Sequence, residues 1–269
     1  MIDVGAQEPQ LNPRLTEAAQ RLYAAQASST PIPPLTETYP NLDVAQAYSV
    51  QRRNLARRLA AGARLRGHKI GLTSAPMQKL LGVDEPDFGY VLDSMVLGDG
   101  TTAPRAAFCA PRVEPEVAFL LRAPLRGPGV TVAEVMAATE AVAAALEIVD
   151  SRIADWRITL ADTVADNASS GAVVLGEWVP ISDAPQLPDT TAALYLNDTL
   201  VETGQGTAVM GDPAAAVAWL ANALAEYGTE IEAGQFVMSG SYTTAAFVGA
   251  GDRAAATITG LGAVGLSFE

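Results

Sequence analysis

The chain has 269 residues, of which 49% are hydrophobic and 17% are charged, so a sizeable core can form and global disorder is disfavoured. Its formal net charge is -13, from 30 acidic and 17 basic residues. This acidic excess argues against nucleic acid and anionic membrane surfaces as partners, because both attract Lys and Arg.

The first part of the chain is predicted to be helical. One helix is expected over residues 12–26, and a second over 44–61, capped by Asp43 and stopped by Gly62. A strand is then predicted over residues 65–72 and a short helix over 74–81. Residues 82–89 are predicted to form a loop, and residues 90–97 an extended segment that ends in a turn at 98–100.

The second part of the chain alternates predicted strands and helices. Thr131 and Glu134 form a capping box, which predicts a helix from residue 131 through the alanine-rich stretch to 146. Asp212 followed by Pro213 predicts another helix, ending near Gly228. The expected strands cover residues 112–121, 171–175, 192–196, 199–202, 235–239, 246–248, 254–258 and 264–268.

The expected architecture is an α+β fold in a single catalytic domain over residues 1–269. Residues 1–64 would form a helical N-terminal portion, and residues 65–269 a β-rich, metal-binding core. The chain contains no internal repeat and no linker that would separate two independent domains.

Two glutamates lie on one face of the predicted strand at 112–121. Side chains alternate between the faces of a strand, so Glu114 and Glu116 share a face with Ala118, opposite the side that carries Val113 and Val117. Neighbouring buried carboxylates repel each other and lose hydration. The pattern therefore indicates either a shared proton or a bound cation.

Glu147 supplies a third carboxylate from an otherwise apolar stretch, where an unpaired glutamate is costly. Three carboxylates without clustered His or Cys suit a hard cation, Mg²⁺ or Mn²⁺, better than zinc. The alternative is that these glutamates are exposed, or form ion pairs with Arg112 and Arg152.

Lys69 and His68 adjoin each other in the predicted strand at 65–72. Lys69 lies between Gly67 and Gly71, so it is either a proton donor, an anchor for a carboxylate, or a lysine that extends to solvent at the strand end. His68 is the only histidine, which argues against a Ser-His-Asp triad and against zinc sites built from histidines. It is the one imidazole that could act as a general base, but a structural or surface role is favoured. The polar cluster at residues 166–171 is either a ligand-binding turn or an ordinary one.

Two features indicate a cytoplasmic protein. Cys109 is the only cysteine, so no intrachain disulfide can form, and the thiol is expected to be inert. Residues 1–4 do not begin a signal peptide, and the alanine-rich stretches are interrupted by charge before they reach membrane-spanning length.

Taken together, these segments resemble the 2-oxopent-4-enoate hydratase family of the fumarylacetoacetate hydrolase superfamily, over nearly the whole chain. That family includes hydratases of 2-hydroxy-dienoates, among them 2-oxo-hept-4-ene-1,7-dioate hydratases, and the related 4-oxalocrotonate decarboxylases. The segments that carry the resemblance are GHKIGLTS at 67–74, EPDFG at 85–89, PRVEPEVAF at 111–119, LEIVDSR at 146–152, ADNASS at 165–170, GDR at 251–253 and GLGAV at 260–264.

The resemblance implies a mixed β-roll or barrel of the fumarylacetoacetate hydrolase C-terminal type. It implies a homo-oligomer, a pentamer or decamer, and a complex with a sister pathway enzyme. It also implies roles for nine residues. The metal ligands would be Glu114, Glu116 and Glu147, the catalytic residues Lys69, Asp87 and Ser169, and the substrate-binding residues Leu72, Asn167 and Thr243.

The implied reaction belongs to the meta-cleavage catabolism of aromatic compounds. A small 2-hydroxy-2,4-dienoate would gain water at C4 to give a 4-hydroxy-2-oxo acid, through a dienolate stabilised by Mg²⁺ or Mn²⁺ as a Lewis acid. Lys69 and Asp87 would transfer protons and position water. Two alternatives remain: a 4-oxalocrotonate-type decarboxylase, which uses the same dienolate, and a non-catalytic partner subunit of a hydratase–decarboxylase complex.

Overall fold

The computed structural model describes residues 12–269, and residues 1–4, used above to argue against a signal peptide, lie outside this range. Its α-helices are α1 (Pro13–Ser28), α2 (Leu35–Thr38), α3 (Val44–Ala60), α4 (Ala75–Leu81), α5 (Val132–Ala138), α6 (Leu160–Ala165) and α7 (Pro213–Ala225). Asp43 and Gln46 form a capping box at the start of α3, which confirms Asp43 as the cap.

The larger sheet has the strand order β2-β1-β11-β5-β6-β7-β3, with β12 paired to β5 and β8 to β6. Its pairs β1–β11 and β3–β7 are parallel and the rest are antiparallel, so the sheet is mixed. The strands are β1 (Leu65–Gly71), β2 (Asp87–Leu92), β3 (Val96–Leu97), β5 (Arg112–Leu121), β6 (Thr139–Val149), β7 (Ser170–Leu175), β8 (Val179–Pro180), β11 (Phe236–Ser241) and β12 (Ala246–Phe247).

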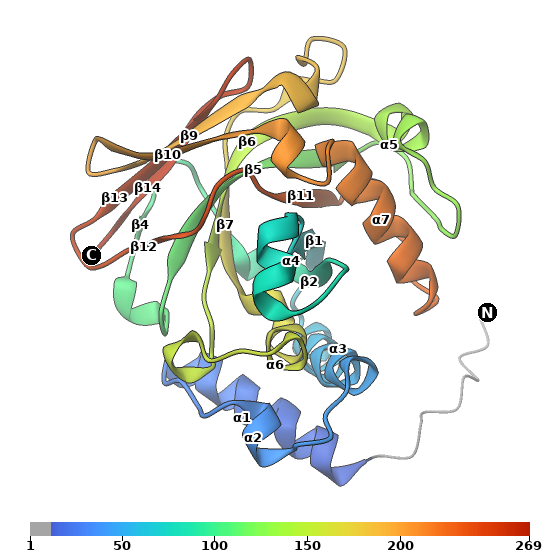
Figure 1. Cartoon of the computed structure of the whole chain (residues 1–269), viewed down its shortest axis with the longest axis vertical. Coiled ribbons are helices and arrows are strands. Elements are labelled where there is room, and N and C mark those ends of the chain that lie inside the picture. The colour runs from blue at the N-terminus through green and yellow to red at the C-terminus, as the bar shows by residue number, and fades with distance from the viewer. Residues whose placement is uncertain (1–11) are drawn as a thin grey trace.

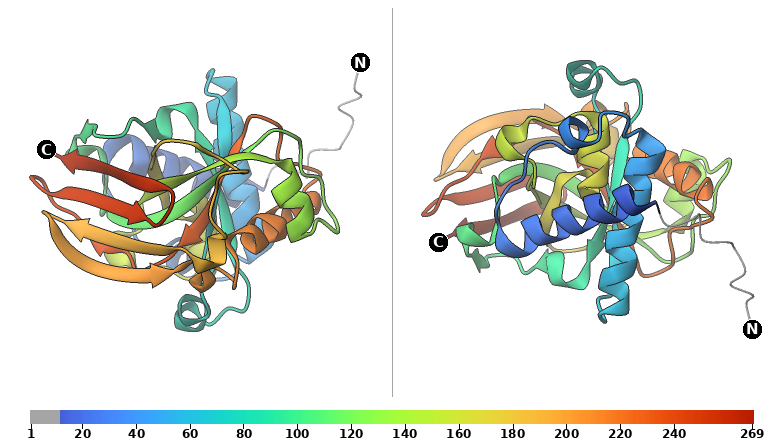
Figure 2. Two further views of the ribbon diagram at one scale, coloured as in Figure 1. Left: turned by 90° about the horizontal axis from the view of Figure 1, so that it is seen from above. Right: turned by 90° about the horizontal axis from the view of Figure 1, so that it is seen from below.

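The smaller sheet has the order β10-β9-β13-β14-β4, and its antiparallel pair β9–β10, at the strands predicted over 192–196 and 199–202, turns at Asn197 and Asp198. Figure 1 shows it beside the long, curved β5 and β6, and the view from above in Figure 2 shows its strands extending to one side. Its strands are β4 (Thr102–Ala103), β9 (Thr191–Leu196), β10 (Thr199–Gln205), β13 (Arg253–Ile258) and β14 (Gly262–Phe268).

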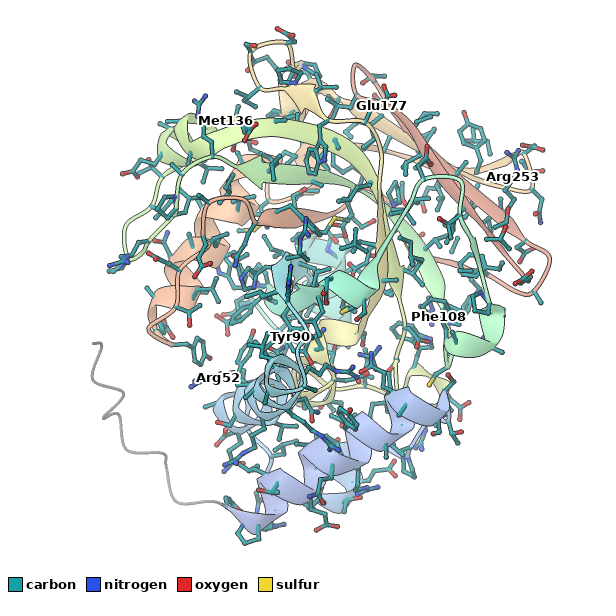
Figure 3. All side chains as sticks on the ribbon, turned by 180° about the vertical axis from the view of Figure 1, so that it is seen from behind. Arg52, Tyr90, Phe108, Met136, Glu177 and Arg253 are labelled. Atoms are coloured by element: carbon teal, nitrogen blue, oxygen red, sulfur yellow. The ribbon has the colours of Figure 1, made fainter. Side chains whose placement is uncertain are left out.

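Helices from both ends of the chain cover the larger sheet. α3 packs against α1 and α6, which lie together at the bottom of Figure 1, and Figure 2 shows α1 crossing α3 from below. The main buried apolar cluster extends from Ala18 in α1 to Phe268 in β14. In Figure 3, Tyr90 lies near the centre beside α3, and Arg253 lies out on the smaller sheet. This mixture of helices and sheets confirms the α+β class.

α7 is a core helix, although its composition resembles that of a membrane span. Among residues 12–269, the stretch Gly206–Ala225 is the one long and apolar enough to cross a membrane, and half of its apolar window is buried. α7 packs against α5 and β11. Its apolar character is therefore accounted for by contacts inside the protein.

The predicted helix over residues 131–146 is wrong. α5 ends at Ala138, and Thr139–Val149 forms the central strand β6 between β5 and β7. Every residue of β6 except Glu140 is buried. A strand covered on both faces reads as a continuous apolar run, and here tertiary packing overrides the helical preference of alanine.

The predicted loop over residues 82–89 is also partly wrong, because β2 already begins at Asp87. Asp87 pairs with Gly71 and Gly89 pairs with Lys69 in the antiparallel β1–β2 ladder. Asp87 is therefore held on a rigid, fully buried strand.

Candidate active site

Three carboxylates converge where β5 and β6 pair. Glu114 stands directly opposite Glu147 in the ladder, and Glu116 follows two residues later on the same face of β5. One oxygen from each of the three glutamates lies within 4.8 Å of the others. Glu116 and Glu147 are fully buried and Glu114 is half-buried.

Burial makes these carboxylates reluctant to ionise together. Burial and the nearby Glu147 raise the pKa of Glu114 to about 7. Burial and the charges of Glu147 and Glu114 raise the pKa of Glu116 well above its ordinary value, although the Gly240 amide donates a 2.8 Å hydrogen bond to its Oε2 atom. The cluster is therefore stabilised by added positive charge.

The donor set fits a hard divalent cation. Oε1 of Glu116 and both carboxylate oxygens of Glu147 are enclosed and accept no hydrogen bond from residues 12–269. Such oxygens suit Mg²⁺ or Mn²⁺ as ligands. The alternative ion pairs are not found in this range: Arg152 pairs with Asp166 and Asp150, and Arg112 forms no ion pair.

Lys69 projects from β1 toward the glutamates and does not extend to solvent. Its Nζ atom donates a 2.8 Å hydrogen bond to the carbonyl of Ala168 and lies 3.4 Å from Oε2 of Glu147. Burial by itself lowers the pKa of Lys69, but the charges of Glu147 and Asp87 outweigh it and raise that pKa above its ordinary value. Lys69 is therefore a buried ammonium group.

Asp87 lies beside Lys69 at the start of β2. Its Oδ1 atom is enclosed and has no hydrogen-bond partner in the described chain. Burial raises the pKa of Asp87, and the charge of Lys69 opposes the shift. A Cβ atom at residue 71 would collide with Oδ1, so Gly71 makes room for this carboxylate.

Ser169 belongs to a strained turn. Asn167, Ala168 and Ser169 have φ of 58°, 50° and 53°, in the left-handed region that residues other than glycine seldom occupy. The turn directs the Ala168 carbonyl to Lys69, while the Ser169 hydroxyl lies 3.2 Å from that of Thr163.

Arg152 holds this turn in place. Its Nε atom donates to Oδ1 of Asp166 at 2.6 Å, and its guanidinium also donates to the backbone carbonyls of Asp166 and Ser170. Asp150 in turn accepts hydrogen bonds from the backbone amides of Cys109 and Ala110. This buried network, which sequence reasoning did not predict, fixes the turn that contacts Lys69.

A cavity of about 350 Å³ opens above these groups. Of the predicted site residues, Lys69, Leu72, Asp87, Glu114, Ser169 and Thr243 line it. Glu116 and Glu147 are not among its lining residues and lie behind Glu114, where they complete the carboxylate cluster. Eight of the nine predicted residues thus belong to one site.

Asn167 does not line the cavity and, unlike Glu116 and Glu147, does not belong to the carboxylate cluster. Its side chain accepts a hydrogen bond from the Tyr90 amide at 2.8 Å and donates one to the Tyr90 carbonyl at 3.0 Å. Both ends of the carboxamide are therefore engaged by the backbone of β2. This geometry indicates a structural role for the Asn167 side chain.

His68 is buried on β1 but does not line the cavity. Burial lowers its pKa to about 4, against the effect of a hydrogen bond with the backbone of Gly89. The imidazole is therefore neutral at pH 7, as expected for a structural residue.

Sequence reasoning missed Arg112, Trp156 and Thr163, which also line the cavity. Arg112 could have been found, because it precedes Glu114 by two residues and so shares its face of β5. Trp156 and Thr163 lie outside the strands, so the two-residue alternation of strand side chains does not indicate their place in the site.

Comparisons with known proteins show the family to which the chain is related. The family described as "Fumarylacetoacetate (FAA) hydrolase C-terminal" matches residues 57–267. A 2-keto-4-pentenoate hydratase of Paraburkholderia xenovorans is 45% identical over 94% of this chain and 94% of the relative. A 2-oxo-hept-4-ene-1,7-dioate hydratase of Escherichia coli is 41% identical over 85% and 88%.

A solved structure is also similar. The 4-oxalocrotonate decarboxylase from Pseudomonas putida G7, complexed with magnesium and adipate, superposes with a TM-score of 0.94 at 32% identity, covering 98% of this chain and 100% of that one. The likeness extends to the fold as a whole.

Proposed function

The chain belongs to the fumarylacetoacetate hydrolase C-terminal family and is a hydratase of 2-hydroxy-2,4-dienoic acids, and we propose that its reaction takes place in the cavity between Lys69, Asp87 and the three glutamates. The observation that carries this proposal is the placement of a buried ammonium and a buried carboxyl group beside the carboxylate cluster. An addition of water needs a proton donor, a proton acceptor and stabilisation of negative charge in one place.

Glu114, Glu116 and Glu147 would hold the metal ion, Mg²⁺ or Mn²⁺. The enclosed oxygens of Glu116 and Glu147 that accept no hydrogen bond within residues 12–269 support this assignment, and the similar decarboxylase structure contains magnesium. When bound, the ion supplies positive charge that polarises a 2-oxo acid.

Lys69 and Asp87 would move the protons. The 2-hydroxy-dienoate first becomes its 2-oxo-3-enoate tautomer by losing a proton from oxygen and gaining one on carbon. Water then adds to C4 while C3 gains a proton. Asp87, whose pKa is raised by burial, is placed to accept protons from the enol and from water. Lys69, held by Ala168 and Glu147, is placed to donate a proton or to anchor the carboxylate.

The remaining predicted residues would act on the substrate or support its site. Leu72 and Thr243 line the cavity and would contact the substrate, and Ser169, the third predicted catalytic residue, would present its hydroxyl to it. Asn167 would support the substrate through the strained turn and the backbone of Tyr90, without touching the substrate.

A decarboxylase is the second candidate, because the solved structure with the 0.94 TM-score bears that name. Its identity to this chain is 32%, whereas the two hydratases are 45% and 41% identical. The presence of Lys69 and Asp87 beside the three glutamates disfavours a non-catalytic partner subunit. We further propose one catalytic domain over residues 1–269, in the cytoplasm, assembled as a homo-oligomer (pentamer or decamer) that associates with a sister pathway enzyme.

The reaction is tested with purified protein, Mg²⁺ and 2-hydroxypenta-2,4-dienoate. Proton NMR is expected to show the 4-hydroxy-2-oxo acid accumulating as the diene signals disappear. Release of CO₂ from 4-oxalocrotonate, with no water added to any dienoate, would establish the decarboxylase instead.

A further inference from the structure

Arg112 is a cation in the cavity wall without an anionic partner. It lies on β5 and lines the cavity together with Glu114. Within residues 12–269 it forms no ion pair and its side chain makes no hydrogen bond, and its Nε atom is enclosed without a partner. A guanidinium that is partly removed from water and unpaired is costly unless a ligand satisfies it.

Two aromatic rings hold this guanidinium in place. Its Cζ atom lies 4.2 Å from the ring centroid of Trp156 and 4.0 Å from that of Phe247. Such contacts stabilise the cation and leave the N–H groups at its edge free. Arg112 is therefore fixed in orientation without losing its hydrogen-bond donors.

Both aromatic residues adopt unfavourable arrangements, Trp156 in its backbone and Phe247 in its exposure to solvent. The Trp156 indole donates a 3.0 Å hydrogen bond to the carbonyl of Ala110, and its backbone has a φ of 54°, in the left-handed region. Phe247 pairs with Arg112 across β12 and β5, yet it is 63% exposed. Strain and an exposed aromatic ring at the same place are typical of a binding site.

Arg112 lies on the outer side of the carboxylate cluster. Along one face of β5, Glu116 is fully buried, Glu114 is half-buried, and Arg112 follows next to the exposed Phe247. Residues two apart on a strand are separated by about 7 Å. A substrate whose 2-oxo acid end lies at the glutamates would therefore extend its far end toward Arg112.

We propose that Arg112, clamped by Trp156 and Phe247, is a specificity-determining residue that binds a second carboxylate at the far end of the substrate. The preferred substrate class is then a dicarboxylic 2-hydroxy-dienoate. A guanidinium presents two parallel N–H donors to a carboxylate, whereas an alkyl end would leave them unsatisfied. This inference rests on the proposed function for the placement of the 2-oxo acid end.

The test compares two unreactive ligands that share the 2-oxo acid end, 2-oxoadipate and 2-oxohexanoate, by calorimetry with Mg²⁺ present. The wild type is expected to prefer 2-oxoadipate. Arg112→Met is expected to weaken 2-oxoadipate binding by roughly 10- to 100-fold, the loss of a charge-assisted pair. Binding of 2-oxohexanoate is expected to stay within about threefold, which also shows that the variant is folded.

Two further variants complete the design. Arg66→Met removes an exposed arginine from β1 and is expected to change neither affinity. Arg112→Lys keeps the positive charge but lacks the two parallel N–H donors of a guanidinium. It is expected to show part of the preference for 2-oxoadipate that Arg112→Met loses. Equal loss of both ligands in Arg112→Met, or no loss of either, would overturn the proposal.

The same comparison separates this inference from the proposed function. If the protein binds 2-oxoadipate through Arg112 but hydrates neither a dicarboxylic nor a monocarboxylic dienoate, the proposed function fails and the subsite stands. If it hydrates both with equal kcat/KM, and Arg112→Met leaves that ratio unchanged, the subsite fails and the hydratase stands.

Discussion

Glu114 and Glu147 face each other directly across the β5–β6 ladder, both on the side of the sheet that carries Glu116. Like charges directly opposite on neighbouring strands destabilise a sheet. This pair is therefore a site that favours the binding of positive charge.

Glu116→Gln is expected to weaken Mg²⁺ binding by at least about tenfold, because even indirect partners of metal ligands cost that much when removed. Without metal, the same change is expected to leave the protein as stable as the wild type or more so, since one buried carboxylate is gone. Calorimetry with Mg²⁺ and Mn²⁺ measures the first effect and urea unfolding the second.

Glu140→Gln is the matched control for that variant, because Glu140 lies on the same β6 strand as Glu147 but is exposed. It is expected to bind Mg²⁺ as the wild type does. Unchanged Mg²⁺ affinity in both Glu116→Gln and Glu147→Gln would show that the cation binds elsewhere.

Lys69→Met is expected to lower kcat by roughly 100-fold or more, in the range of positioned acid–base groups. Its effect on Mg²⁺ affinity is expected to be much smaller, because the proposed role of Lys69 is on the substrate. The chain has one other lysine, the exposed Lys79 of α4, and Lys79→Met provides the control. A Lys69→Met enzyme that keeps near-normal kcat would remove Lys69 from the mechanism.

Asn167→Ala separates the two roles considered for this residue. Losing both hydrogen bonds to the Tyr90 backbone is expected to cost roughly 1–3 kcal/mol of unfolding free energy. KM is expected to change little, because the side chain does not line the cavity. A large rise in KM with unchanged stability would restore Asn167 as a substrate ligand.

His68 provides a test of pH dependence. Its pKa is lowered by burial from 6.5 to about 4, so between these values the unfolded chain binds more protons than the folded one. Its contribution to stability is therefore complete above pH 6.5 and is lost as the pH falls to 4, by roughly 3 kcal/mol.

His68→Gln is expected to flatten the difference in unfolding free energy between pH 6.5 and 4. Because His68 is the only histidine, its imidazole signals in an NMR titration are unambiguous. An imidazole that titrates near pH 6.5 in the folded protein would contradict the burial described here.

The carboxylate site was largely predictable from the sequence, because a strand has a period of two and Glu114 and Glu116 occur at that spacing. The position of Glu147 was not predictable in the same way. The alanine-rich stretch before it favours a helix locally, and only packing between β5 and β7 makes it a strand. The roles of Arg112 and Asn167 depend on partners far away in the sequence, Phe247 and Tyr90, which no local pattern indicates.

The central claim is that this cavity adds water to C4 of a dienoate, and its most direct test is isotopic. The wild type is incubated with Mg²⁺ and 2-hydroxypenta-2,4-dienoate in ¹⁸O-water, and the product is analysed by mass spectrometry after the exchangeable 2-oxo oxygen has been discounted. We predict one ¹⁸O atom at C4 of a 4-hydroxy-2-oxo acid, formed much more slowly by Lys69→Met. A product without ¹⁸O at C4, or the same rate of labelling in Lys69→Met as in the wild type, would contradict the account.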